Sequence, residues 1–105
     1  MKMVRAIVRP EKEEAVAKSL EEAGFSSLTK FDVLGRGKQK GIQIANSVYD
    51  ELAKSFLMLV VDDSAMPRAI EAIHAGARTG NFGDGKIFVT HVDKAYTIRT
   101  GKEGL

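Results

Sequence analysis

Cysteine is absent from the 105-residue chain, and no run of apolar residues is long enough to cross a membrane. Without cysteine the chain can form neither a disulfide bond nor a thiolate metal site, which is usual for proteins of the cytoplasm. The stretch Met1–Pro10 alternates apolar and charged residues, so we expect neither a signal peptide nor a membrane span. The sequence therefore predicts a soluble, cytoplasmic protein.

A large excess of charge of one sign is also missing. The chain has 16 Lys and Arg residues against 14 Asp and Glu, a net charge of +2. Nucleic-acid binding would then need strongly clustered positive charge, and an RNA-recognition module would need stacking aromatic residues in a defined strand pattern. Phe56 and Phe88 do not lie in that pattern. We expect no direct contact with nucleic acid.

Residues typical of catalytic and metal sites are scarce. The two histidines, His74 and His91, have no metal-ligand spacing, so we interpret them as structural or exposed. No serine–histidine–acid set and no paired carboxylates point to catalysis, and we predict that the protein is not an enzyme. The alternative is a small phosphate-ester enzyme, such as an acyl-phosphate hydrolase, which would need an arginine and an amide placed for in-line attack by water. Steady phosphate release would support that alternative.

The periodicity of apolar residues predicts the order β-α-β-β-α-β, followed by a short extra strand, within one domain over residues 1–105. We expect helix one to expose Glu13, Glu14, Glu21 and Glu22, and helix two to be capped by Asp63 or Ser64 and to end near Arg78. The expected elements are strands at Lys2–Arg9, Ser27–Leu34, Ser55–Val61, Lys86–Val92 and Lys94–Arg99, and helices at Glu11–Ala23 and from Asp63 or Ser64 to Arg78.

Between the second and third strands lies a long segment, Gly35–Lys54, which begins with glycine and basic residues. We expect an exposed loop here, with room for a turn of helix in Ser47–Lys54. The strand after it, Ser55–Val61, is nearly all apolar, which indicates burial on both faces. The polar tail beyond Arg99 is expected to be mobile unless something binds it.

This order of elements is that of a ferredoxin-like α+β sandwich, with four antiparallel strands and both helices on one face. The other face carries Ile7 and Phe31, so a monomer would expose apolar sheet. The sequence therefore predicts a homo-oligomer.

The stretch Ala77–Phe88, A-R-T-G-N-F-G-D-G-K-I-F, places three glycines within six residues. Backbone N–H groups in such a loop can point into one concavity, where Lys86 would add a mobile positive charge. This combination suits a phosphate group. The alternative is a glycine-rich turn with no ligand, because the stretch matches neither of the standard nucleotide-binding glycine patterns.

A second motif, G-R-G-K-Q-K-G at Gly35–Gly41, accompanies the first, with R-P-E-K at Arg9–Lys12 and I-R-T-G at Ile98–Gly101. Over nearly its whole length the chain resembles the PII signal proteins of nitrogen metabolism. The resemblance implies a homotrimer of ferredoxin-like subunits. Such a trimer would bind ATP or ADP in clefts between neighbours and would sense 2-oxoglutarate through a long loop that docks on a target.

The resemblance also implies roles for particular residues. From the residues alone, Lys38–Lys40 could equally be a solvated loop without a ligand. The implied nucleotide-binding positions are Ile7, Thr29, Gly35, Arg36, Gly37, Lys38, Gln39, Val60, Gly83, Asp84, Gly85, Lys86 and Arg99. The implied 2-oxoglutarate positions are Gln39, Lys40, Gly41 and Lys54, and Gln39 would coordinate Mg²⁺ through its amide oxygen, a ligand that suits this hard cation.

The chain departs from the family pattern at three residues and in a shorter loop between Gly41 and Lys54. Lys38 stands where arginine is commoner, Thr97 replaces a basic residue, and Tyr49 does not align with the family's modifiable tyrosine, so uridylylation is not expected. The shorter loop resembles the branch linked to nitrogen fixation, whose members act on dinitrogenase. The expected partner is thus a nitrogenase component or a PII-like paralogue, with an ammonium channel or glutamine synthetase as the alternative.

Overall fold

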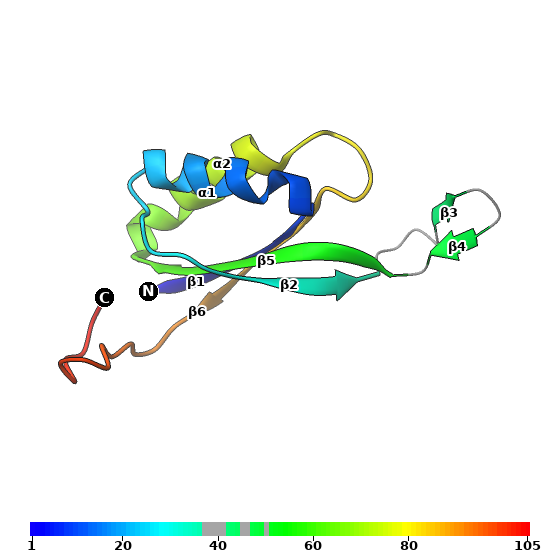
Figure 1. Ribbon diagram of the computed structural model, residues 1–105. Coiled ribbons are helices and arrows are strands. Elements are labelled where there is room, and N and C mark those ends of the chain that lie inside the picture. The colour runs from blue at the N-terminus through cyan, green and yellow to red at the C-terminus, as the bar shows by residue number, and fades with distance from the viewer. Residues whose placement is uncertain (37–41, 45–46, 50) are drawn as a thin grey trace.

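The computed structural model describes residues 1–36, 42–44, 47–49 and 51–105. A four-stranded antiparallel sheet in the order β2-β5-β1-β6 has both helices on one face (Figure 1). The elements are β1 (Lys2–Val8), a 3-10 turn (Pro10–Lys12), α1 (Glu13–Glu22), β2 (Thr29–Gly35), β3 (Ile42–Ile44), β4 (Ser47–Tyr49), β5 (Leu52–Val61), a 3-10 turn (Asp63–Ala65), α2 (Met66–Ala77) and β6 (Gly85–His91).

The core lies between the sheet and the two helices. The alternation in β1 buries Val4, Ala6 and Val8 completely or nearly so, as the sequence predicts. Helix α1 contributes Val16 and Leu20 to the same layer. The helical and strand periods of the sequence therefore locate the buried side of these elements correctly. The full cluster is Val4, Ala6, Val8, Val16, Leu20, Leu57, Leu59, Val61, Ala69, Ala72, Ile73 and Ala77.

Gly76 lets the two helices approach closely. A Cβ added at Gly76 would lie 2.7 Å from the Cα of Val16 and 2.9 Å from the carbonyl oxygen of Ala15. Both are backbone atoms of α1, so no side-chain rotation can relieve the contact. The missing side chain of Gly76 therefore sets the spacing of the helix layer.

We expect Gly76→Ala to destabilise the fold by about 1–3 kcal/mol, the usual cost of overpacking, although alanine favours a helix by about 1 kcal/mol over glycine. The measurement is the midpoint of urea unfolding. Lys18→Ala, at an exposed position of α1, is the control, because it introduces alanine into a helix without crowding the contact between the helices. A Gly76→Ala protein as stable as the parent would contradict this account of helix spacing.

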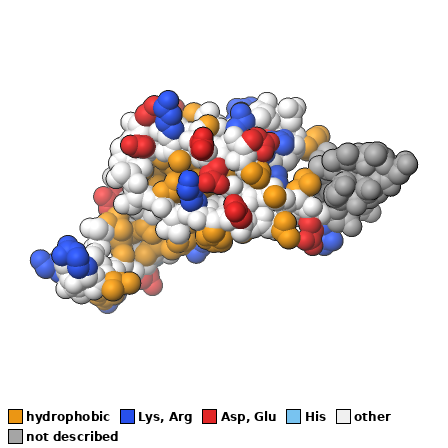
Figure 2. Space-filling view, viewed as in Figure 1, with side chains coloured by type: hydrophobic (Ala, Val, Ile, Leu, Met, Phe, Trp, Pro, Cys, Tyr) orange, Lys and Arg blue, Asp and Glu red, His pale blue; other side chains and the backbone are white. Residues whose placement is uncertain are grey.

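The face of the sheet away from the helices is apolar and open in the isolated chain. Phe31 and Phe56 stack there with ring centroids 4.6 Å apart, and Phe31 and Phe88 remain about half exposed, at 50% and 48%. In Figure 2 hydrophobic side chains gather below the helices, over the strands, whereas charged side chains cover the helices. The expectation that one chain alone exposes apolar sheet is confirmed.

Two expectations for the middle of the chain are wrong. Residues 47–49 form β4, which pairs with β3, and β5 begins at Leu52, so the expected turn of helix in Ser47–Lys54 is absent from the described residues. Strand β5 also does not bury both faces in this chain: Ser55, Leu57, Leu59 and Val61 are buried while the alternate residues are half-buried. Because β5 pairs with β2 as far as Leu52, it begins three residues before the apolar run Ser55–Val61.

The expected short strand at Lys94–Arg99 is also wrong. Beyond β6 there is only an isolated bridge between Tyr96 and Glu103, and the turn is closed by a 2.9 Å hydrogen bond from Thr97 N to the Lys102 oxygen. The tail thus pairs with itself and adds no strand to the sheet.

No helix in the described part of the chain is long and apolar enough to cross a membrane.

Two local assignments also change. Neither Asp63 nor Ser64 caps α2 through its side chain; Asp63 lies 3.0 Å from the amino group of Met1. Glu13 is not simply solvent-facing: its carboxylate accepts a 2.6 Å hydrogen bond from the buried Ser55 hydroxyl and pairs with Lys30 at 3.0 Å. The Ser55 hydroxyl, and then Lys30, hold the pKa of Glu13 below its ordinary value.

Candidate functional site

The glycine-rich stretch forms a turn between the end of α2 and the start of β6. Gly80, Gly83 and Gly85 have φ values of +88°, +95° and +111°, in the region that side chains disfavour. Gly85 also needs to lack a side chain for a second reason: an added Cβ would lie 1.7 Å from the carbonyl oxygen of Ile7 in β1. The glycines are therefore required by the path of the backbone.

Asp84 closes this turn from inside. Its carboxylate accepts 2.8 Å hydrogen bonds from the backbone N–H groups of Thr79 and Gly80, and a further one from the Thr79 hydroxyl. The Thr79 hydroxyl is the main reason that the pKa of Asp84 lies well below its ordinary value, and backbone donors and Arg9 add to it. The side chain of Asp84 thus ties residues 79–84 into one unit.

Two cations from neighbouring strand ends hold the tied turn against the sheet. Arg9, just after β1, donates from Nε to Asp84 Oδ1 at 3.3 Å and from Nη2 to the carbonyl oxygen of Phe82 at 2.6 Å. Lys54 of β5 donates from Nζ to the carbonyl oxygen of Gly83 at 2.7 Å. The turn is therefore fastened to two strands that precede it in the chain.

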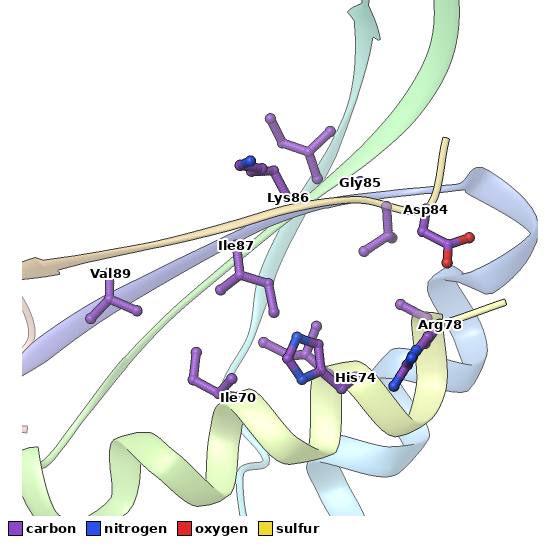
Figure 3. A pocket seen from close by; sticks show the side chains of 12 residues that line it. Ile70, His74, Arg78, Asp84, Gly85, Lys86, Ile87 and Val89 are labelled. Carbon is purple, nitrogen blue, oxygen red and sulfur yellow. The ribbon is translucent and has the colours of Figure 1, made fainter. Parts of the chain in front are cut away.

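Lys86 and Ile87 point to opposite sides of β6, as expected for successive residues of a strand (Figure 3). Ile87 points toward α2, where a cavity of about 500 Å³ lies between the helix and β6, next to Ile70 and His74. Lys86 points away from α2 and is paired across the strands with Ile7. Its ammonium is therefore available on the open side of the sheet, beside the turn.

The structure brings part of the predicted site together. The turn residues Gly83–Lys86, Ile7 opposite Lys86, and Lys54 on the Gly83 carbonyl form one cluster. Thr29 and Val60 lie farther along the open face, paired with Met58 and Met3. Gly35 ends β2 opposite Leu52, and Arg36 follows it, exposed. The predicted positions outside the described residues are Gly37, Lys38, Gln39, Lys40 and Gly41.

Arg99 does not join this cluster within the chain. It lies in the tail beyond β6, whereas the turn precedes β6, and the seven residues of the strand span roughly 20 Å. Figure 1 shows the yellow turn and the orange and red tail at opposite ends of β6. If Arg99 and the turn contact the same ligand, two copies of the chain must contribute to the site.

Sequence reasoning missed the roles of Arg9 and Thr79. Arg9 lies in the motif Arg9–Lys12, which supported the resemblance without receiving a function, and it is 75 residues from Asp84 in the chain. Only the pairing of β1 with β6 brings them together. The predicted magnesium ligand, Gln39, lies outside the described part of the chain, which itself contains no group of three His, Cys, Asp or Glu side chains suited to a metal ion.

Fold and turn together define a class of protein: a ferredoxin-like α+β domain with a braced glycine turn at one end of its sheet and a long excursion between β2 and β5. The sequence profile described as "Nitrogen regulatory protein P-II" matches residues 1–102. The chain belongs to this family, whose members are signal-transduction regulators and not enzymes.

Individual relatives place the chain within the family. It is 59% identical to "Nitrogen fixation nifHD1 region GlnB-like protein 1" of Methanosarcina barkeri and 60% identical to the corresponding nifHD region protein of Methanococcus maripaludis, each over 100% of both chains. The P-II protein of Bradyrhizobium diazoefficiens is 40% identical over 100% of this chain and 97% of its own length. The chain is thus of the nitrogen-fixation-linked branch.

A solved structure agrees with the fold. The Arabidopsis thaliana PII protein bound to citrate superposes with a TM-score of 0.82 at 35% identity, covering 98% of this chain and 84% of that one. The ferredoxin-like prediction is therefore confirmed, apart from the extra carboxy-terminal strand.

Proposed function

We propose that the chain, as one domain over residues 1–105, is a nitrogen-status signal protein that binds ATP or ADP and, with Mg-ATP, 2-oxoglutarate. It would pass this information to nitrogenase, or to another component of nitrogen fixation, through the loop between Gly35 and Leu52. The observation that carries the proposal is the braced glycine turn with Lys86 beside it. The output is a change of loop conformation.

The turn supports nucleotide binding because it is folded before any ligand arrives. Positive φ at Gly83 and Gly85 lets backbone N–H groups face an anion, and Lys86 supplies a compact charge on the same side as Ile7. Asp84, the one acid in the turn, bonds inward to Thr79 and Gly80. Its negative charge is thereby offset by donors of the turn itself.

The open apolar face supports a homotrimer. Phe31 and Phe88 are half exposed there, and the remote position of Arg99 leaves the nucleotide cluster of one chain without its predicted carboxy-terminal cation. Association of the open faces would cover the phenylalanines and let the tail of one copy approach the turn of another. The predicted site would then lie between subunits.

Lys54 supports a link between effector and nucleotide. One of its three ammonium protons is directed to the Gly83 carbonyl, which leaves two donors for a carboxylate. The same lysine lies on β5 opposite Val33, at the base of the loop that carries Gln39. An oxoglutarate bound to Lys54 would therefore contact a residue that lies at the base of the loop and is itself hydrogen-bonded to the turn.

The target is proposed from the relatives' names, which refer to the nifHD region. Regulation of an ammonium channel or glutamine synthetase is the second candidate, because one relative is named simply as a P-II protein, without reference to nitrogen fixation. Affinity purification of the tagged protein with and without 2-oxoglutarate separates the two. Nitrogenase components or a PII-like paralogue should co-purify under the first proposal, and an ammonium channel or glutamine synthetase under the second.

Calorimetric titration tests the ligands. We expect ATP and ADP to bind the purified protein, and 2-oxoglutarate to bind only when Mg²⁺ and ATP are both present, because ADP lacks the γ-phosphate. Sedimentation should give a trimer. If neither nucleotide binds, the proposal is wrong, and steady release of phosphate from ATP would instead favour a phosphate-ester enzyme.

Lys86 should supply much of the nucleotide affinity. We expect Lys86→Met to weaken ATP binding by about tenfold to thirtyfold, as for loss of one charge-assisted hydrogen bond, and to leave adenosine binding unchanged. Because Lys86 is exposed, unfolding stability should stay nearly constant. Lys18→Met, on the exposed side of α1, controls for the lost charge. Equal losses for ATP and adenosine would remove the phosphate role of Lys86.

A further inference from the structure

We propose that Arg9 is a positioning residue that braces the glycine turn from the end of β1. Arg9 bonds to the Asp84 carboxylate, which in turn accepts a hydrogen bond from the Thr79 hydroxyl. This inference rests on the proposed function, because the turn that Arg9 braces is the proposed phosphate site. Arg9 would act on the ligand through the turn and would not contact it.

The contacts of Arg9 carry the inference. The guanidinium spans two points of the turn, since Nε reaches Asp84 Oδ1 at 3.3 Å and Nη2 reaches the Phe82 carbonyl at 2.6 Å. It also packs against the residue between them: a Cβ added at Gly83 would lie 3.1 Å from Nη2. One side chain just after β1 therefore holds the turn at Phe82 and Asp84 and lies close to Gly83 between them.

The geometry of the guanidinium group explains why an arginine suits this position. Its planar guanidinium offers several donors in a fixed arrangement, so one side chain can satisfy a carboxylate and a carbonyl together. The Arg9 and Asp84 side chains are 25% and 23% exposed, so their contact is partly shielded from water, whereas the bond to the Phe82 carbonyl is exposed. A lysine could reach one of the two acceptors as a point charge and would brace the turn less well.

Hydrogen bonds within residues 79–84 hold the Asp84 carboxylate from the side opposite Arg9. Thr79 and Gly80 donate their backbone N–H groups to the carboxylate, and the N–H of Asn81 donates to the Thr79 hydroxyl at 3.2 Å. Each bond within residues 79–84 is local, so it does not fix where the turn lies. Among the described contacts, only Arg9 and Lys54 attach the turn to other strands through their side chains.

Hydrogen exchange of the ligand-free protein decides the bracing role without reference to nucleotide. We expect Arg9→Met to accelerate exchange in residues 79–84 by about tenfold, the loss of roughly one to two hydrogen bonds, with exchange in α1 and β5 unchanged. Arg9→Lys should restore part of the protection, and Lys18→Met should have no effect. Thr79→Val, which removes the hydroxyl that donates to Asp84 and accepts from Asn81, should accelerate exchange in the same segment.

ATP titration of the same variants decides whether the brace matters for the ligand. We expect Arg9→Met and Thr79→Val to weaken ATP binding severalfold, and Arg9→Lys to lie between Arg9→Met and the parent. Unchanged exchange in residues 79–84 overturns the inference, and so does faster exchange with unaltered ATP affinity. A fall in affinity without faster exchange would make Arg9 a direct ligand contact, which also overturns it.

The two proposals fail separately. If the parent protein binds no nucleotide, the proposed function is wrong, while exchange in Arg9→Met still shows whether Arg9 braces the turn. If the parent binds ATP and Arg9→Met exchanges like the parent, the function stands and the brace is wrong.

Discussion

Gly85→Ala should cost the protein roughly 3 kcal/mol or more of unfolding free energy and should remove nucleotide binding. An alanine Cβ would lie 1.7 Å from the Ile7 carbonyl oxygen, far inside any tolerated contact, and φ at this position is +111°. The start of β6 must then leave β1, which breaks the pairing of Gly85 with Val8. Urea unfolding and ATP titration measure the two losses.

Gly80→Ala is the matched control for this prediction. Gly80 lies in the same turn with a similar φ of +88°, but an added Cβ there meets nothing within 4 Å. Its expected cost is that of backbone strain alone, about 1–2 kcal/mol. If the two variants lose equal stability, positive φ accounts for both, and the close approach of β6 to Ile7 has no separate effect.

The same glycines show how far the sequence can predict this site. Clustered glycines between a helix and a strand indicate positive φ, and all three positions have it. The sequence does not show that Gly85 passes against the Ile7 carbonyl, because that contact depends on the register of β1 against β6. Local conformation is predictable here from residue type, whereas the packing that makes Gly85 irreplaceable is not.

In the fold, too, the burial pattern within an element is predictable from the sequence, whereas the pairing between elements is not. Alternation in β1 and the helical stripe of α1 predict the buried residues, because each element has one face toward the core. The start of β5 at Leu52 could not be predicted, since pairing with β2 continues past the apolar run. The expected carboxy-terminal strand is absent although its apolar residues alternate, because Tyr96 pairs with Glu103 in the tail and not with a strand of the sheet.

Charged residues were the least predictable. Arg9, Lys54 and Glu13 each bond to a group far away in the chain, at separations of 75, 29 and 42 residues. A sequence shows that such residues are polar and gives no partner for them. Their contacts nevertheless organise this end of the molecule, because Arg9 and Lys54 fasten the turn and Glu13 joins α1 to β5 and β2.

Lys54 joins the two parts of the proposed site. It pairs across the sheet with Val33, near the end of β2, while its ammonium reaches the turn at Gly83. Gln39, the proposed magnesium ligand, follows Gly35 at the end of β2 by four residues in the sequence. Lys54 therefore lies between the strand end that leads to Gln39 and the turn that is proposed to hold the phosphates.

Gln39→Ala should abolish the binding of 2-oxoglutarate in the presence of Mg-ATP while sparing much of the affinity for ATP. Mg²⁺ prefers six oxygen ligands in a near-ideal octahedron, so loss of the amide oxygen removes one ligand that water replaces without fixing the loop. ATP would keep its proposed contacts with Lys86 and the turn. Calorimetric titration of 2-oxoglutarate into Mg-ATP-loaded protein measures the effect.

Gln43→Ala is the matched control, because Gln43 is the other glutamine of the chain and lies in the same loop, on β3. It should bind 2-oxoglutarate like the parent protein. Gln39→Glu separates ligation from charge: it keeps an oxygen for Mg²⁺ but adds a negative charge beside the dicarboxylate, so oxoglutarate binding should weaken without disappearing. Parent-like binding by Gln39→Ala would show that the effector is held without this residue, and the coupling of Mg-ATP to 2-oxoglutarate would then have to run through Lys54 and the Gly83 carbonyl.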